Sequence, residues 1–475
     1  MTKRVIACLA ALTLALSLLP VTALADELEV QTSDATVEEL GGESDALLTT
    51  SEGEDPPAPT ITYVAEIDGT KYATLDEAIT AASESTESVT ITVLKDCGIT
   101  TGMDIDEKNL TIQGANAENR PTITMTEVGI YANESELTFK DCVLNISVKD
   151  NPIQSGATCN LFNNSDLTLN HVALTLVPAA DVGAGTKHGI FFYRYSNFYV
   201  TNYSAVEVSN FSTNGSSGIY SDYNEDEGDD YKADQRTIQI TDHSTVTVRG
   251  CGWNGMTVNP SDILIDGDSH VDITNCGIGA DGRGGLGCYY GYLKISNNSS
   301  LTTNNNLGTS TKLPCGAFVK ELYMDGTSTL NSCGNNGYGL VIGGKGQIPA
   351  GATVTIKNNT SAGLYSYSSS NYWFGDVTVY DDANVTIQNN LFGIYVLAGS
   401  KLNMACGNVT NNGGNATGGG LWNRGGTVVL GSKVDIYNNH ATTAGDDIYS
   451  ADYTTKKNVR YPATITIGST GNWTL

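Results

Sequence analysis

Aromatic side chains stand two residues after a recurrent glycine through much of the chain. The glycines are Gly189, Gly218, Gly255, Gly287, Gly316, Gly339, Gly363, Gly393 and Gly420, spaced 23 to 37 residues apart. The residues two positions later are Phe191, Tyr220, Thr257, Tyr289, Phe318, Val341, Tyr365, Tyr395 and Trp422. Seven of these nine are aromatic, although aromatic residues make up 8% of the chain. Aromatic rings stack on the apolar faces of sugar rings, so the pattern predicts a glycan-binding stripe.

A glycine-rich segment beside this pattern holds the candidates for acid–base chemistry. Asp281 and Arg283 flank Gly282 within the run Asp281–Gly285, and Arg249 is a second basic candidate. Removal of a proton next to a carboxylate needs a basic group of perturbed pKa. Asp281, Arg283 and Arg249 are therefore the candidate catalytic residues, although an exposed turn explains the same residues without catalysis.

A second polar segment alternates oxygen-bearing side chains in the manner of a calcium-binding loop. The alternating residues are Asp222, Asn224, Asp226 and Asp230, with Gly228 between the last two. The glycine stands one position late for an EF-hand, and no bidentate Glu follows at the required distance. The sequence requires no cofactor, and this loop is a candidate Ca²⁺ site. A solvated turn is the alternative, because Asp and Asn favour turns for backbone reasons.

The elements that must position these residues are short strands. In 376–396, β-branched residues alternate with polar ones between the turns Asp381–Asn384 and Asn389–Asn390, and Gly393 opens a third strand. Similar units recur at 237–251, 262–276, 292–306 and 321–333. Coils of this size bury their inner faces only by stacking, so the sequence predicts a solenoid. Stacked coils would align the aromatic residues on one face. The alternative is a ladder of rings that only stabilises the sheet, and a register slip of one residue would turn every ring inward.

These repeats resemble those of the right-handed parallel β-helix proteins, the pectate-lyase-like solenoids, particularly secreted and surface forms from gut bacteria. The resemblance covers residues 61–475 and implies an all-β fold, with the parallel β-helix over 97–475. Hydrolases of this class carry the motifs NTD, GHG and RIK, and the chain contains none of the three. The resemblance therefore predicts the fold more strongly than the function.

The N-terminal part predicts export and a cap. Residues 1–25 have a basic start, an apolar run and an A-x-A site, as in a secretory signal peptide. Residues 26–60 hold eleven acids and no Lys or Arg, which predicts an acidic disordered linker. Residues 61–96 predict a small α+β cap on the solenoid: a hairpin around Asp68–Gly69, a helix after Thr74, and a strand. A small separate domain is the alternative for this segment.

The negative net charge of the chain disfavours some classes of binding partner. The chain carries −27 at neutral pH, and removal of Lys3 and Arg4 with the signal would leave −29, of which −18 belongs to residues after 60. This charge repels nucleic acid and anionic membranes, and no later stretch is apolar enough to insert into a membrane. Neutral glycans are easier partners than anionic polymers on this basis.

Cysteines suggest a buried corner. Cys251, Cys276 and Cys333 occupy the position that Asn389 or Asn390 fills in the 376–396 unit, which predicts an inward ladder of small residues. Disulfides Cys251–Cys276 and Cys288–Cys315 are alternatives to free thiols.

Taken together, these features leave three functional hypotheses. The first is a secreted or surface-displayed binding solenoid for glycans or a host or cell-surface protein. The second is a β-helix polysaccharide lyase or glycoside hydrolase, and the third is a passive surface stalk.

Overall fold

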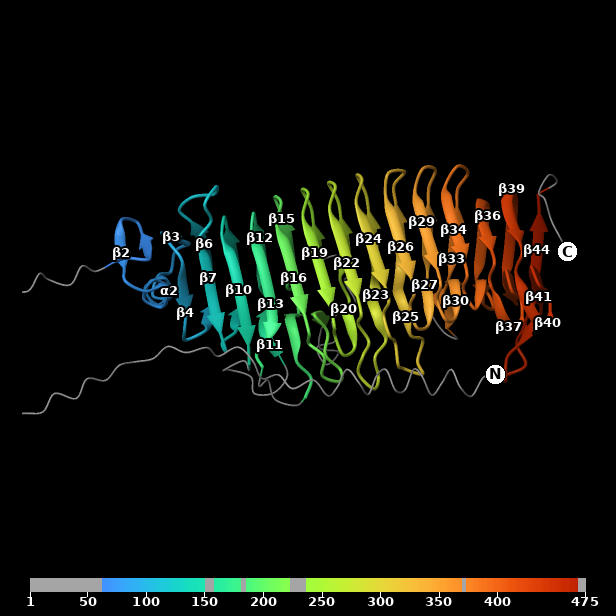
Figure 1. Cartoon of the computed structure of the whole chain (residues 1–475), viewed down its shortest axis with the longest axis horizontal. Helices are drawn as coiled ribbons and strands as arrows, with labels where there is room; N and C mark the ends of the chain where they lie inside the picture. The colour runs from blue at the N-terminus through green and yellow to red at the C-terminus, as the bar shows by residue number, and fades with distance from the viewer. Residues whose placement is uncertain (1–61, 150–157, 181–184, 223–235, 370–372, 469–475) are drawn as a thin grey trace, which may run out of the picture. The chain divides into compact units, whose positions relative to one another are not determined.

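Short β-strands make up most of the structure. The computed structural model describes residues 62–149, 158–180, 185–222, 236–369 and 373–468. The predicted all-β class is confirmed, because 57% of the residues are in strands and 2% in a helix. The strands wind into a parallel β-solenoid of about 11 turns, consistent with a parallel β-helix (Figure 1). The predicted signal peptide and acidic linker lie outside the described residues. No helix in the described ranges has the length and apolar character needed to cross a membrane.

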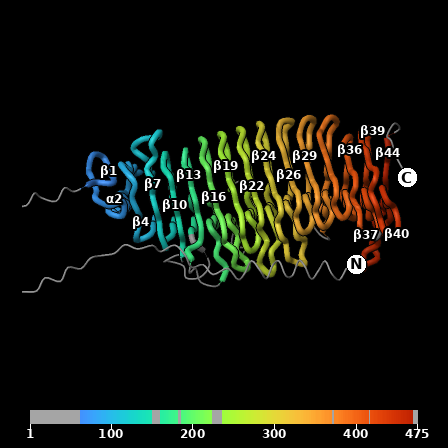
Figure 2. The backbone as a smooth tube through the Cα atoms, in the orientation of Figure 1, coloured from blue at the N-terminus to red at the C-terminus, as the bar shows by residue number. Residues whose placement is uncertain are grey.

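Each coil contributes strands to three parallel sheets, and coils follow one another in chain order (Figure 2). The first, which we call the aromatic sheet, contains β5 (Met103–Asp106), β8 (Ile130–Asn133), β11 (Thr158–Asn163), β14 (His188–Tyr193), β17 (Ile219–Asp222), β20 (Asn254–Val258), the start of β23 (Gly284–Ile295), the start of β25 (Cys315–Met324), β27 (Tyr338–Ile342), β30 (Ala362–Ser366), β35 (Phe392–Val396), β38 (Leu421–Arg424) and β41 (Ile448–Ala451).

The second sheet contains β3 (Val89–Val93), β6 (Asn109–Gly114), β9 (Glu136–Lys140), β12 (Asp166–Asn170), β15 (Phe198–Thr201), β18 (Thr237–Ile240), β21 (Asp262–Ile265), the ends of β23 and β25, β28 (Lys345–Ile348), β33 (Asp376–Val379), the starts of β36 (Lys401–Thr410) and β39 (Thr427–Tyr437), and β44 (Thr464–Ile467). The third contains β4 (Cys97–Ile99), β7 (Thr122–Thr126), β10 (Val143–Val148), β13 (Ala173–Pro178), β16 (Ala205–Ser209), β19 (Thr245–Arg249), β22 (His270–Thr274), β24 (Ser300–Asn304), β26 (Thr329–Cys333), β29 (Thr353–Lys357), β34 (Asn384–Gln388) and the ends of β36 and β39. Four long strands, β23, β25, β36 and β39, turn a corner and so belong to two sheets.

Alternation along the strands builds one continuous core. In β34, the side chains of Val385 and Ile387 are buried in the core, while that of Asn384, the first residue of the strand, is exposed. Register repeats this pattern from coil to coil, so that Ile356, Ile387 and Val409 stack above one another. Because each inner face is covered only by the coils on either side, the repeated β-branched pattern requires stacking, as the sequence predicts.

The first coil is covered by a small α+β segment. Strands β1 (Ala65–Ile67) and β2 (Thr70–Tyr72) form an antiparallel hairpin, and β1 also pairs with the edge of β3. The helix α2 (Leu75–Ser83) begins at a capping box in which Thr74 and Glu77 bind each other's backbone N–H groups. Its apolar face, including Leu75 and Ile79, is buried. The compact unit that contains the solenoid includes this segment.

Asparagines line the corner between the third sheet and the aromatic sheet. The ladder continues from Cys251 and Cys276 through Asn306, Asn335, Asn359, Asn390, Asn412 and Asn439. Each asparagine accepts the backbone N–H of the preceding ladder residue at 3.0 Å. Asp447 ends the ladder by accepting from the Asn439 N–H at 3.1 Å. The predicted corner ladder is therefore confirmed for Cys251, Cys276 and Asn390.

The prediction was wrong for Cys333. This residue lies two positions before Asn335, in β26, and pairs with Asn304 and Lys357 on the neighbouring coils. It is half-buried rather than part of the inner corner. The comparison of repeats misplaced Cys333 by two residues: it ends β26 as Thr274 ends β22, and in both coils the ladder residue follows two positions later.

Candidate functional site

Strand register in the aromatic sheet aligns one residue from each coil. The aligned column contains Asp104, Tyr131, Leu161, Phe191, Tyr220, Thr257, Gly287, Phe318, Val341, Tyr365, Tyr395, Trp422 and Tyr449. Eight of the nine residues that the sequence grouped into a stripe are in this column. Tyr289 is the exception: its coil contributes Gly287, and Tyr289 stands two residues further along β23. The glycine that matches the others in this coil is Gly285, which approaches Gly316 of the next coil.

The rings point away from the core, but several are not exposed to solvent. Phe318, Tyr365 and Tyr395 form an outer apolar cluster, separate from the core, and are 3, 5 and 6% exposed. The prediction that these three rings face solvent was wrong. The remaining four predicted rings, Phe191, Tyr220, Tyr289 and Trp422, are half-buried.

Ring stacking explains this burial. Ring centroids are 4.9 Å apart for Tyr338 and Tyr365, 4.7 Å for Tyr365 and Tyr395, and 4.6 Å for Tyr395 and Trp422. Coils in a parallel sheet are about 4.8 Å apart, which is also a favourable distance for offset stacking. Burial, and then the hydroxyls of Tyr395 and Tyr338, raise the pKa of Tyr365. The stabilising ladder of the alternative interpretation is thus present along this part of the column.

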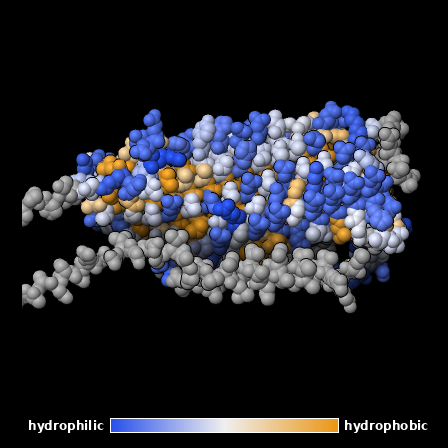
Figure 3. All heavy atoms as spheres, in the orientation of Figure 1, coloured by the Kyte–Doolittle hydropathy of each residue, from blue (hydrophilic) through white to orange (hydrophobic). Residues whose placement is uncertain are grey.

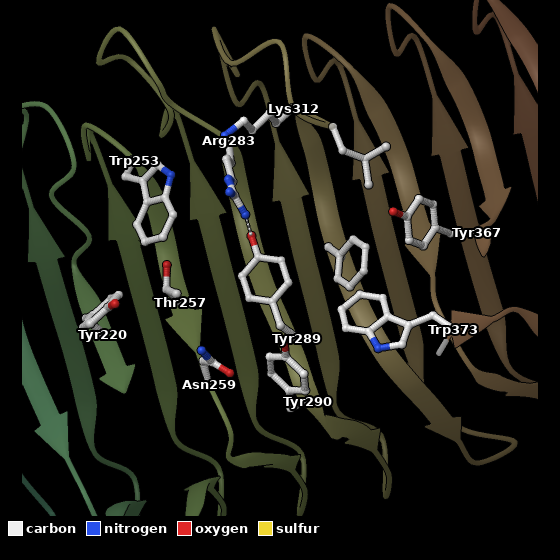
Figure 4. Close-up of a pocket in the computed structure, with 12 residues that line it drawn as sticks. Tyr220, Trp253, Thr257, Asn259, Arg283, Tyr289, Tyr290, Lys312, Tyr367 and Trp373 are labelled. Atoms are coloured by element: carbon white, nitrogen blue, oxygen red, sulfur yellow. Dashed lines mark hydrogen bonds between the residues drawn. The ribbon is translucent and has the colours of Figure 1, made fainter. Parts of the chain in front are cut away.

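An open groove lies on the same sheet, on the N-terminal side of the stacked rings of Tyr338, Tyr365 and Tyr395. We call it the Arg283 groove, and it has a volume of about 500 Å³. Its lining residues are Tyr220, Trp253, Thr257, Asn259, Arg283, Tyr289, Tyr290, Lys312, Leu313, Phe318, Tyr367 and Trp373. The strands β17, β20, β23 and β25 form its floor, while Lys312 and Arg283 stand at one side and Trp373 at another (Figure 4). Seven of its twelve residues are aromatic, and none is acidic.

Arg283 is held over the floor by aromatic contacts. Its Nη1 donates to the Tyr289 hydroxyl at 3.2 Å (Figure 4). Its guanidinium lies 5.3 Å from the Trp253 ring centroid and 5.6 Å from that of Tyr289, within the range of cation–π attraction. Burial raises the pKa of Tyr289, and the nearby Arg283 charge only partly offsets this. The phenol therefore stays protonated at neutral pH.

Trp373 forms the opposite side of the groove. It lies in β32 (Trp373–Phe374), which pairs with β31 (Ser368–Ser369) in a short antiparallel hairpin. Its ring lies 5.3 Å from Phe318 and meets Tyr290 edge-on at 5.7 Å. Lys320 Nζ lies 5.0 Å from the same ring. These contacts fix the orientation of a half-buried Trp that still lines open space.

The candidate catalytic residues are only partly brought together. Asp281 and Arg283 line one cavity of about 410 Å³, which shares Trp253 and Lys312 with the Arg283 groove. Arg249 does not line it: this residue ends β19 in the third sheet and forms an ion pair with Glu207. The grouping of Arg249 with Arg283 was therefore wrong, because the two follow different sheets of the coil.

The predicted calcium loop is described only at its first residue. Asp222 ends β17 and accepts a hydrogen bond from the Tyr220 hydroxyl at 2.7 Å. Asn224, Asp226 and Asp230 lie outside the described residues. Within the described ranges, no group of three or more His, Cys, Asp or Glu side chains is placed to hold a metal ion.

The cysteines are free thiols wherever the structure describes them. Cys288 points into the core, while Cys315 belongs to the outer cluster on the other face of the sheet. A Cys288–Cys315 disulfide is therefore excluded by register, since Cys315 pairs with Gly284. Cys251 and Cys276 occupy successive steps of the corner ladder, and both are free. Burial raises the pKa of Cys288 and of Cys315 to about 12, so both stay protonated.

Several lining residues escaped the sequence pattern. Trp253 and Lys312 stand in the loops that lead into β20 and β25, where coil lengths vary. Tyr338 and Phe392 come directly before a repeat glycine and also join the outer cluster. A second aromatic position, one residue before each glycine, could have found these two. The loop residues have no such signal, because their position depends on how each insertion folds back.

The class of the chain follows from this geometry: it is a parallel β-solenoid with ring-lined grooves on one sheet. Comparison with protein-family models, curated proteins and solved structures finds no match to the chain. Hydrophilic residues cover much of the face seen in Figure 3, and hydrophobic residues gather in patches between them.

Proposed function

We propose that this protein is a secreted or surface-displayed binding solenoid that recognises glycans through the Arg283 groove. The observation that carries the proposal is the groove of about 500 Å³ in which Trp253, Tyr289, Tyr290 and Trp373 surround polar groups. Sugars present apolar C–H faces that stack on rings, and hydroxyls that bind nearby polar side chains. Arg283 and Asn259 supply such polar groups within the same groove.

Accessible rings support this assignment over a purely structural ladder. Tyr290 is 44% exposed, and Trp253 and Trp373 are half-buried. These rings are fixed by their contacts with Phe318 and Arg283, so binding would cost little conformational entropy. The recognition surface thus lies on rings beside the predicted stripe as well as within it.

An extracellular setting fits the proposal. The apolar N-terminal segment has the features of a secretory signal, and the resemblance to pectate-lyase-like solenoids of gut bacteria points the same way. The net charge of −27 disfavours nucleic acid as a partner. A host or cell-surface protein is the other partner that such a face could bind.

Glycan-array binding of the purified protein tests the proposal. We expect Trp373→Ala and Trp253→Ala each to reduce the affinity for a bound glycan by at least about 10-fold, as for central aromatic contacts. Tyr437→Ala is the matched control, because Tyr437 is 43% exposed in β39 and lines neither groove. Circular dichroism should show that all three variants keep their strands. Equal binding by all variants, or no glycan bound by the wild type, would refute the proposal.

Catalysis is a second candidate, favoured by the shared cavity of Asp281 and Arg283. The described lining of this cavity has one carboxylate, whereas most glycoside hydrolases use two, so a lyase is the better form of this hypothesis. Incubation with uronate polymers should then raise the ultraviolet absorbance of unsaturated products, and Asp281→Asn should lower that rate. A reducing-end assay covers hydrolysis. Absence of both products, with binding retained, would leave the binding function alone.

A further inference from the structure

A second groove lies on the aromatic sheet, nearer the C-terminal end of the described chain. We call it the Arg424 groove, and its volume is about 610 Å³. Its lining residues are Tyr338, Tyr365, Ser368, Phe374, Tyr395, Leu397, Ala398, Arg424, Tyr453, Thr455, Lys456, Lys457, Val459 and Tyr461. The hairpin of β42 (Tyr453–Thr454) and β43 (Arg460–Tyr461) supplies one side. Three of the lining residues are basic and none is acidic.

Arg424 is held in the same way as Arg283. Its Nη1 donates to the Tyr395 hydroxyl at 3.3 Å, and its guanidinium lies 4.3 Å from the Tyr453 ring centroid. Both arginines therefore sit over rings of the aromatic sheet and bind a tyrosine hydroxyl. Within the described ranges, neither has a carboxylate partner, whereas Arg249 and Arg460 pair with Glu207 and Asp452.

These two basic positions stand out against the charge of the chain. Acidic residues outnumber basic ones by 52 to 25, yet neither ring-lined groove contains an Asp or Glu. The Arg283 groove adds Lys312, and the Arg424 groove adds Lys456 and Lys457. An unpaired guanidinium over aromatic rings favours an anionic ligand, because it can donate parallel hydrogen bonds to a carboxylate or sulfate.

The grooves lie along one axis. Tyr289 is in β23 and Tyr395 in β35, four coil steps apart in the aligned sheet. At about 4.8 Å per step, the coils of the two tyrosines are about 19 Å apart along the axis. The hairpin β31–β32 stands between the grooves, with Trp373 lining one and Phe374 the other. An extended chain could therefore contact both grooves at once.

We propose that the Arg424 groove is a second binding site, and that it and the Arg283 groove bind acidic groups of one extended glycan chain. The acidic group is a carboxylate or a sulfate ester on the sugar. This inference rests on the proposed glycan-binding function and replaces the neutral ligand that the net charge suggested. The local charge of the two grooves decides the ligand, because salt screens the electrostatic field of the acidic residues elsewhere. At physiological salt this field extends only about 8 Å.

Isothermal titration with four probes tests the inference. Hyaluronan oligosaccharides carry carboxylates, and carboxyl-reduced hyaluronan is their neutral match. Dextran sulfate carries sulfate, and dextran is its neutral match. We expect the wild type to bind an acidic probe at least about 10-fold more tightly than its neutral match, and long oligosaccharides more tightly than short ones. Preference for hyaluronan or for dextran sulfate identifies the carboxylate or the sulfate as the recognised group.

Substitutions locate the sites. Arg283→Gln and Arg424→Gln should each reduce the affinity for the long acidic probe by at least about 10-fold, and the gain with chain length should disappear in either variant. Arg249→Gln is the matched control, because Arg249 is paired with Glu207 outside both grooves. Arg424→Lys keeps the charge and should recover part of the binding, which separates loss of charge from loss of folding.

The outcomes separate the two proposals. Equal binding of acidic and neutral probes, both lost in Trp373→Ala, would retain glycan binding and overturn the acidic-ligand inference. Dependence on Arg283 but not on Arg424 would overturn the second site. Binding of poly-glutamate with an affinity equal to that of the acidic glycans would overturn the sugar component. Binding of none of the four glycan probes would overturn the acidic-ligand inference, whereas the glycan array decides the proposed glycan-binding function separately.

Discussion

The variant Tyr365→Ala tests whether the stacked rings of the aromatic sheet stabilise the solenoid. Tyr365 is 5% exposed and stacks between Tyr338 and Tyr395, with centroid distances of 4.9 and 4.7 Å. Tyr367 adds an edge contact at 5.4 Å. Substitution by alanine would remove all three ring contacts and leave a space in the outer cluster.

The expected loss in the free energy of unfolding follows from the burial and stacking of this ring. Truncation of a buried aromatic residue to alanine costs about 3–5 kcal/mol. The outer cluster lies next to solvent and can partly close, so we expect the lower end, a loss of about 3 kcal/mol in the free energy of unfolding. Two stacked pairs at about 0.5–1.5 kcal/mol each account for a large part of this. Tyr437→Ala should change stability by less than about 0.5 kcal/mol, because Tyr437 is 43% exposed.

Urea unfolding followed by circular dichroism measures the loss, and amide hydrogen exchange locates it. Faster exchange should be concentrated in β27, β30 and β35, since each coil of a solenoid contacts mainly its neighbours. If Tyr365→Ala were as stable as Tyr437→Ala, the ring would not be packed as described, and the stacked ladder would have no stabilising role.

Three further perturbations test the fold that positions the grooves. Burial lowers the pKa of His188 to about 3, below the value of about 6.5 in an unfolded chain, so this residue contributes stability above pH 6.5 that is lost as the pH falls towards 3. The loss between pH 7 and 5 should be about 2 kcal/mol in urea titrations, and His188→Gln should abolish it; identical pH profiles would contradict the assignment. Asn390→Ala leaves ladder donors and acceptors without partners and should cost about 3 kcal/mol in unfolding free energy, whereas the exposed Asn384→Ala should be near neutral. Gly393→Ala would place its Cβ 2.4 Å from a carbonyl oxygen of the next coil and should lower the melting temperature. In the control Gly98→Ala, the nearest atom to the new Cβ is 3.5 Å away, so the melting temperature should not change. Equal melting temperatures of the two variants would disprove the close approach at Gly393.

The sequence by itself determined the fold and the face. Period-two alternation and recurrent glycines require strands whose inner residues are covered only by neighbouring coils, so a parallel solenoid follows. The same periodicity placed Phe191, Tyr220 and Trp422 in one outward column, because side chains alternate strictly along a strand. The capping box at Thr74 likewise fixed the start of α2 from local chemistry.

Only the tertiary structure decided which rings are accessible and where charge gathers. Tyr365 and Tyr395 follow the repeat pattern as closely as Tyr220, yet stacking and the covering hairpins bury them. Arg283 and Arg424 are 141 positions apart in the sequence, and only the coil stacking places both on one sheet over tyrosine rings. Exposure and local charge depend on loops whose lengths vary from coil to coil. A repeat pattern describes what the coils share, so it contains no information on where those individual loops fold.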